Sequence, residues 1–149
     1  MVVFGLVAAA ALGGCASTPT GETFSSLAAP KSDSALLYLY RLDEYYGRGL
    51  SFKVLVDGSE KANIGNGGYL IIPLEAGKHA IQVKGFGYQD VPLDIEAVNA
   101  TTSFLRVVTT KGFGGFSATL TLEPAQQAKA LQELAGLKRE PERFVDQAL

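Results

Sequence analysis

The sequence predicts an all-β domain: an antiparallel β-sandwich of about seven strands, followed by one C-terminal α-helix. Three observations predict this fold. Short apolar runs with alternating or β-branched residues recur along residues 34–123, glycine-rich turn sequences separate them, and a helical pattern follows from residue 124. The 17 glycines suit such a fold, because tight turns need the positive φ that glycine adopts without strain.

The runs that predict strands, in chain order, are 35–41, 51–58, 69–74, 77–85, 91–97, 102–110 and 116–123. The first, "ALLYLYR", is apolar at consecutive positions, so we expect a strand that is covered on both faces. Run 51–58 is apolar at every second residue and ends in Asp57-Gly58, a strong hairpin signal. Pro73 cannot donate a ladder hydrogen bond, so it marks an edge or an end of run 69–74.

The remaining strands differ in the strength of their patterns. Run 77–85 alternates and carries the chain's one histidine, His79, next to a turn, whereas run 91–97 is short and weakly patterned. Run 102–110 is rich in β-branched residues, and run 116–123 alternates cleanly between apolar and polar residues. The glycine-rich segments between runs are predicted to be hairpin connections, since none has the Gly-Lys-Ser/Thr ending of a phosphate loop.

One helix is expected over residues 124–138. Pro124 suits the first helical position, and Gly136 suits the end of a helix. The segment that follows, 139–149, is expected to be a charged tail.

Residues 1–14 have the features of a secretory signal peptide. Residues 2–12 carry no charge and would span roughly 16 Å as a helix, too short for a bilayer core of about 30 Å. The sequence Leu12-Gly13-Gly14-Cys15 resembles the bacterial lipobox, which implies cleavage before Cys15 and acylation of its sulfur and its new amino group. The alternative is a buried apolar N-terminal strand or helix in which the cysteine is incidental.

The lipobox also implies a location. A chain acylated at Cys15 is held firmly in a membrane, because two or more acyl chains bind far better than one. Ala16 is not the Asp that retains lipoproteins in the inner membrane of enteric bacteria, so the resemblance implies the outer membrane of a bacterial cell envelope, facing the periplasm. The composition of residues 15–33 predicts a flexible tether between the lipidated Cys15 and a domain at 34–138.

Residues 54–90 carry a family resemblance. They combine a strand ending in Val-Asp-Gly, the pattern Pro-Leu-x-x-Gly-x-His-x-Ile-x-Val and a later Gly-Tyr, and so resemble the PEGA-type β-sandwich module of bacterial surface proteins. With "ALLYLYR" before and "LQELAGLK" after, the chain more closely resembles the small bacterial lipoproteins catalogued as domain of unknown function 2846, over about residues 34–138. The resemblance implies a fold and brings no catalytic residues.

Charge and composition argue against several classes of function. The 13 basic and 15 acidic residues give a net charge of −2, which offers no attraction for nucleic acid. One cysteine and one histidine do not supply a metal site, so we expect no metal and no cofactor. Asp43 and Glu44 are adjacent and would point opposite ways in a strand, which makes a poor acid/base pair. We therefore expect no catalytic residues and no enzyme.

The loop "DEYYGRGLS" at 43–51 is the candidate ligand-binding site. Tyr45 and Tyr46 could present flat amphipathic surfaces, and Arg48 could form paired hydrogen bonds to a carboxylate or phosphate. The alternative is that both tyrosines roof one end of the sandwich. The sequence thus predicts a membrane-anchored, non-catalytic envelope lipoprotein whose domain binds an envelope protein or a glycan. The other hypotheses are an accessory subunit of a larger envelope assembly and, last, a hydrolase of an envelope polymer.

Overall fold

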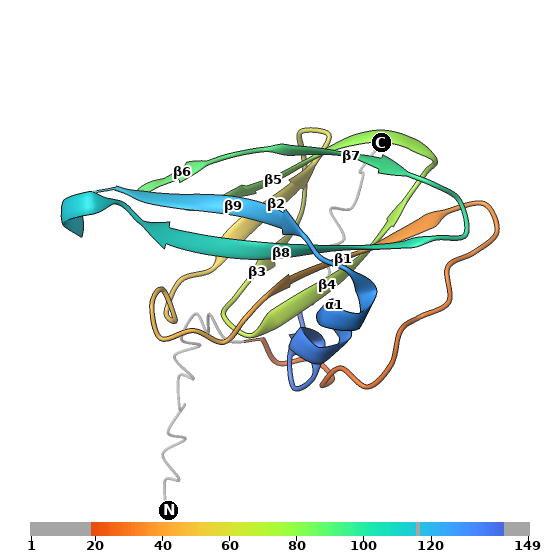
Figure 1. Cartoon of the computed structure of the whole chain (residues 1–149), viewed down its shortest axis with the longest axis horizontal. Coiled ribbons are helices and arrows are strands. Elements are labelled where there is room, and N and C mark those ends of the chain that lie inside the picture. The colour runs from red at the N-terminus through yellow and green to blue at the C-terminus, as the bar shows by residue number, and fades with distance from the viewer. Residues whose placement is uncertain (1–18, 116, 142–149) are drawn as a thin grey trace, which may run out of the picture.

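The computed structural model describes residues 19–115 and 117–141, so Cys15, the signal peptide and most of the expected tail lie outside it. Strands dominate the described chain, which confirms the all-β prediction (Figure 1). They are β1 (Ala35–Arg41), β2 (Phe52–Val56), β3 (Ser59–Ile64), β4 (Gly68–Leu74), β5 (Gly77–Lys84), β6 (Tyr88–Asp90), β7 (Leu93–Ala97), β8 (Thr102–Lys111), β9 (Ala118–Pro124) and β10 (Lys138–Arg139). A short 3₁₀ turn, η1 (Phe113–Gly115), joins β8 to β9, and one α-helix, α1 (Gln127–Leu134), follows β9.

The strands form two sheets. One has six strands in the order β10-β4-β1-β8-β9-β6, and the other has four in the order β3-β2-β5-β7. The expectation of antiparallel pairing throughout is wrong, because β1 pairs with β8, β6 with β9 and β10 with β4 in parallel. The described chain also has more strands than the seven expected, since β3, β6 and β10 were not predicted.

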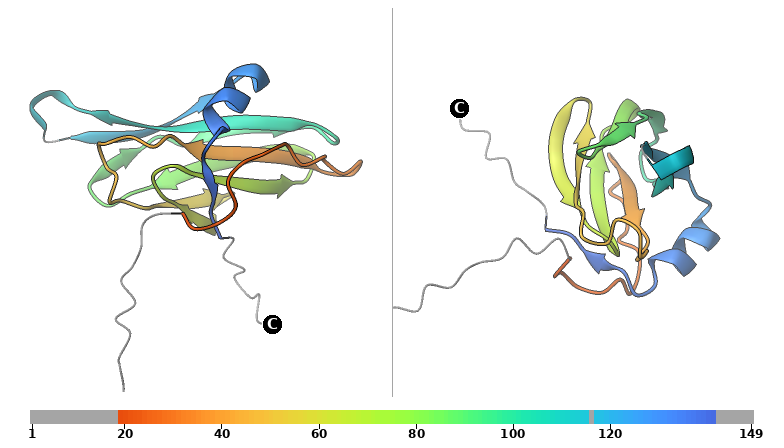
Figure 2. Two further views of the ribbon diagram at one scale, coloured as in Figure 1. Left: turned by 90° about the horizontal axis from the view of Figure 1, so that it is seen from below. Right: turned by 90° about the vertical axis from the view of Figure 1, so that its left-hand side faces the viewer.

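A hydrophobic core lies between the two sheets, which stack as two layers (Figures 1 and 2). Alternate residues of the longer strands point into it, as the period of two requires. The six-stranded sheet contributes Leu37, Leu39 and Leu120 among others, and the four-stranded sheet contributes Val54, Ile64 and Ile81, all of them almost fully buried.

A second core covers the outer face of the six-stranded sheet. Tyr38 and Tyr40 point into it from β1, and Ala130 and Leu134 meet them from α1. The Tyr40 hydroxyl donates a 2.5 Å hydrogen bond to Glu133, which fixes the helix to the sheet. Burial raises the pKa of Tyr40, and the hydrogen bond to Glu133 raises it further. β1 is thus buried at every residue, which confirms the prediction of a strand covered on both faces.

The helix is shorter than the expected 124–138. Pro124 closes β9, and the amide of Ala125 donates to the carbonyl oxygen of Phe104, so the chain is still held by the sheet where the helix was expected to begin. The helix ends at Leu134, and Gly136 follows with a φ of 87°, the left-handed conformation typical of a helix end.

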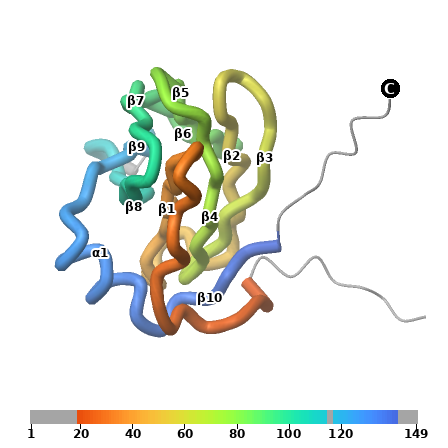
Figure 3. The backbone as a smooth tube through the Cα atoms, turned by 90° about the vertical axis from the view of Figure 1, so that its right-hand side faces the viewer, coloured from red at the N-terminus to blue at the C-terminus, as the bar shows by residue number. Residues whose placement is uncertain are grey.

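The described part of the expected tether is attached to the domain. The amide of Gly21 donates to the carbonyl of Arg139 (3.1 Å), that of Arg139 to Glu22 (2.9 Å) and that of Phe24 to Leu137 (2.8 Å). Figure 3 shows this segment beside β10. This differs from the flexible tether expected over 15–33, because residues 21–24 are hydrogen-bonded to Leu137 and to Arg139 at the start of the expected charged tail.

The ring of Phe24 anchors the N-terminal segment. It lies edge-on to Tyr38 and Tyr69, with ring centroids 6.3 and 5.7 Å away, and the amide of Ala28 donates a 2.8 Å hydrogen bond to the Tyr38 hydroxyl. The segment and α1 together cover the outer face of the six-stranded sheet. Within the described residues, no helix combines the length and apolar composition needed to cross a membrane.

We expect Phe24→Ala to lower the free energy of unfolding by about 1–2 kcal/mol, because it removes a half-buried ring and its aromatic contacts. Amide hydrogen exchange should rise at Gly21, Phe24 and Arg139. The exposed neighbour Ser25 provides the control, since Ser25→Ala should leave both the stability and the exchange unchanged. Unchanged exchange in Phe24→Ala would contradict the docking of this segment.

Candidate functional site

Four connections meet at one end of the two sheets, which we call the loop end. They are the loop 42–51 between β1 and β2, the turn 65–67 between β3 and β4, the turn 85–87 between β5 and β6, and the turn between β8 and β9. The register requires this, because Phe52 pairs with Ile64, and Tyr88 and Lys111 both pair with Ala118. The loop end is on the left of Figure 1 and faces the viewer in the right panel of Figure 2.

Arg41, the last residue of β1, holds the loop 42–51 from beneath. Its guanidinium donates to the carbonyl oxygens of Gly47 and Leu50, each at 2.7 Å, and lies 4.4 Å from the ring centroid of Phe52. The side chain is 3% exposed. Burial lowers the pKa of Arg41, because removal from water disfavours the charged form. Sequence reasoning missed this residue, which looks like an ordinary polar strand end.

The start of the same loop is held by the turn 65–67. The side-chain oxygen of Asn66 accepts a hydrogen bond from the amide of Glu44 (3.1 Å), and its amide nitrogen donates to Asp43 (2.5 Å). Beneath the turn, the buried carboxylate of Glu140 accepts a 2.5 Å hydrogen bond from the amide of Gly65. Burial raises the pKa of Glu140. The loop is therefore fixed at both ends.

The three candidate residues have different surroundings. Tyr45 is 91% exposed, so its ring can be contacted from solvent. Tyr46 is 37% exposed and lies under Lys111, whose ammonium is 4.0 Å from the ring centroid. Arg48 is exposed and pairs with Asp43 at 3.3 Å, a contact that solvent screens. Tyr46 therefore fits the alternative of a roof, whereas Tyr45 and Arg48 are open to solvent.

Tyr46 also contacts Tyr88, which begins β6. Burial raises the pKa of Tyr88, and a side-chain hydrogen bond with Tyr46 raises it further. The ring of Tyr88 packs edge-on against Phe52 at 5.1 Å, so the contact joins the loop to the inter-sheet core.

Two further aromatic residues at the loop end were missed by sequence reasoning. Phe86 and Phe113 occupy the tips of the neighbouring turns and are as exposed as free side chains, at 105% and 107%. The flanking glycines predicted these turns. A turn pattern does not show whether an apolar side chain at its tip packs on the domain or projects into solvent.

His79 lies at the opposite end of the sheets. One ring nitrogen, Nδ1, is 2.6 Å from a carboxylate oxygen of Asp57, and Nε2 is 2.8 Å from the carbonyl oxygen of Glu75. The hydrogen bond with Asp57, then that with Glu75, raises the pKa of His79. Both nitrogens hold turns, so this imidazole acts as a structural link between the β2–β3 and β4–β5 connections.

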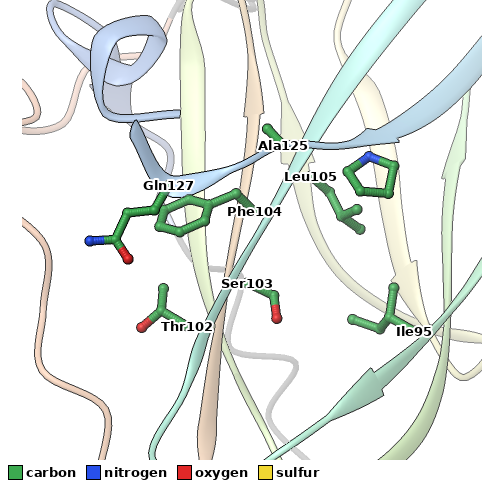
Figure 4. Close-up of a pocket in the computed structure, with 8 residues that line it drawn as sticks. Ile95, Thr102, Ser103, Phe104, Leu105, Ala125 and Gln127 are labelled. Atoms are coloured by element: carbon green, nitrogen blue, oxygen red, sulfur yellow. The ribbon is translucent and has the colours of Figure 1, made fainter. Parts of the chain in front are cut away.

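A shallow hollow of about 340 Å³ lies between β7, β8 and the start of α1 (Figure 4). Ile95, Phe104 and Leu105 supply apolar walls, and the polar groups are the hydroxyls of Thr102 and Ser103 and the amide of Gln127. These are hydrogen-bonding groups, and no titratable side chain lines the hollow. Elsewhere in the described residues, no three His, Cys, Asp or Glu side chains are grouped to hold a metal.

Comparison with known proteins adds no identification: no family model matches the chain, and no curated protein matches it. The resemblance to the two bacterial families therefore stays a prediction from the motifs.

We expect Arg41→Met to lower the free energy of unfolding by about 1.5–3 kcal/mol, because two carbonyl oxygens lose a charged donor. Hydrogen exchange across 43–51 should rise sharply. The matched control is Arg48→Met in the same loop, which removes an exposed cation and should change stability by no more than about 0.5 kcal/mol. Equal effects of the two substitutions would show that Arg41 does not clamp the loop.

Proposed function

We propose that this protein is a lipid-anchored component of the bacterial cell envelope, whose two-sheet domain is a non-catalytic β-sandwich that binds another envelope component. The observation that carries the proposal is the loop end, where a clamped loop presents exposed aromatic and charged side chains. Sandwich domains bind through loops gathered at their ends, because the strands supply a rigid frame.

The lipobox supports the anchor. Cys15 is the chain's one cysteine, and it lies only four residues before Pro19, the first described residue. Acylation at that position would hold the domain against a membrane, which we propose is the outer membrane, on its periplasmic side. In this proposal the acyl chains attach the protein to the membrane.

The binding surface is proposed to include Tyr45 and Arg48. The loop has few conformations to lose on binding, since Arg41 and Asn66 fix its backbone at both ends. Preorganisation of this kind leaves more of the contact energy for affinity. The partner is another envelope protein or a glycan, because a tyrosine ring can stack on either and a guanidinium can bind carboxylates of both.

The non-catalytic role is supported by how the polar side chains are used. Both ring nitrogens of His79 already accept or donate hydrogen bonds within turns, and Asp43 is shared by Asn66 and Arg48. These groups stabilise connections and are not arranged as a nucleophile with a base.

The anchor is tested with Cys15→Ser in the full chain. We expect the variant to lose the mass of the acyl chains and to leave the membrane fraction. The lipid is attached through a thioether to the cysteine sulfur, which serine lacks. Mass spectrometry and cell fractionation make the measurement, with Ser17→Ala as a control that keeps the lipid. Lipid still attached to the Cys15→Ser protein would refute the anchor.

The binding surface is tested with the double change Tyr45→Ala and Arg48→Ala. Cosedimentation with purified cell-wall sacculi and crosslinking to envelope proteins in cells should fall by about tenfold or more, since truncating central contact residues costs roughly 2 kcal/mol. The melting temperature should stay nearly fixed, because both side chains are exposed. Tyr46→Ala is the contrasting variant: it should lower the melting temperature. A double variant that melts early yet binds normally would identify the loop as a roof.

A further inference from the structure

The tetrapeptide Lys-Gly-Phe-Gly occurs twice in the chain, at 84–87 and at 111–114. Both copies form turns, and in both the final glycine has a positive φ, 78° at Gly87 and 80° at Gly114. In both copies the lysine is exposed and the phenylalanine projects fully into solvent. A fully exposed phenylalanine at a turn tip is unfavourable in water, so two of them in the same local setting indicate a surface that is covered in use.

The sheet places these two turns side by side. β6 begins at Tyr88, directly after the first copy, and pairs in parallel with β9 at Ala118. Ala118 also pairs with Lys111, the first residue of the second copy. The two turns therefore lie at the same end of the molecule, on the left of Figure 1.

The chain enters the domain at this same end. Pro19 lies so close to Gly68 that a β-carbon on the glycine would approach Pro19 Cγ to 3.0 Å. A continuous set of contacts then leads from the neighbouring turn to the tips: Asn66 bonds Asp43 at the start of loop 42–51, and Tyr46 in that loop contacts Lys111. Three residues separate Cys15 from Pro19, and the four steps along the chain span at most about 14 Å.

We propose that the loop end docks on the lipid bilayer that holds the acyl chains of Cys15, with Phe86 and Phe113 inserted at the boundary between headgroups and acyl chains. This inference rests on the lipid anchor proposed above. Lys84 and Lys111 are exposed and precede the two phenylalanines by two residues each, and the proposal places them at the lipid phosphates while the rings enter the apolar layer. Such pairing of cationic and aromatic residues is typical of proteins that lie on a membrane surface.

The short connection selects the bilayer as the occupant. With residues from Gly21 to Phe24 hydrogen-bonded to the domain, the link between the lipid and the folded chain is a few residues and not the whole of 15–33. Because the link is short, the loop end, from which it leaves the domain, reaches the membrane first. Docking would also place Tyr45 and Arg48 at the membrane surface, where their partner would then be met.

The chain contains no tryptophan, so one introduced tryptophan reports from one site. The variants are Phe86→Trp and Phe113→Trp in the full acylated protein, reconstituted in vesicles of phosphatidylethanolamine and phosphatidylglycerol with brominated acyl chains. The matched control is Val98→Trp, because Val98 is also exposed but lies in the turn at the opposite end of β8. We expect blue-shifted emission and several-fold stronger quenching in both loop-end variants than in the control.

Flotation of the vesicles separates the two hypotheses. Protein that floats with the lipid, but whose loop-end variants are quenched no more than Val98→Trp, keeps the anchor and overturns the docking. Protein that carries no lipid and stays at the bottom overturns the anchor and the docking with it. Emission that shifts with purified sacculi and not with vesicles assigns the phenylalanine tips to a glycan and overturns the bilayer assignment. Circular dichroism should show the same fold in all three variants.

Discussion

The structure depends on one constraint, which is that β1 is apolar on both of its faces. Every residue from Ala35 to Arg41 is buried, so the sheet that contains this strand must be covered on both sides. The four-stranded sheet covers one side, and α1 with the N-terminal segment covers the other. Tyr38 is the centre of the second contact, since its ring meets both Phe24 and Phe104. The six-stranded sheet is therefore the middle layer of three.

This constraint links the fold to the attachment of the chain. One helix of two turns is too small to cover the outer face, and the segment around Phe24 completes the cover. Arg139 of β10 holds that segment through backbone hydrogen bonds with Gly21 and Glu22, and Leu137, just before β10, accepts one from Phe24. These bonds and the pairing with β4 explain why two charged residues, Lys138 and Arg139, form a strand. The need to bury β1 thus shortens the link to the proposed lipid.

Sequence patterns predicted the strands whose side chains alternate or are fully apolar, because burial determines those patterns. β3, "SEKANI", escaped detection because a bulge at Lys61, opposite Val54 and Leu55 of β2, breaks the alternation and because only two of its six residues are buried. β10 escaped because its two residues are charged and show no apolar pattern, although their amides donate backbone hydrogen bonds to Gly67 and Glu22. At the site, the sequence pointed to Tyr45, Tyr46 and Arg48, but their separate surroundings depend on Lys111 and Asp43, which only the folded chain brings near.

Arg41 extends the same constraint from the core to the surface. It is the last residue of the doubly covered strand, and its buried charge is stabilised by two carbonyl oxygens and the face of Phe52. Those carbonyls belong to loop 42–51. If the loop left its position, the buried guanidinium of Arg41 would lose both acceptors, which is energetically costly. A rigid loop beside two exposed phenylalanine tips forms a surface whose shape is set before any partner arrives. Binding there, to a bilayer or to an envelope component, requires little ordering of the protein.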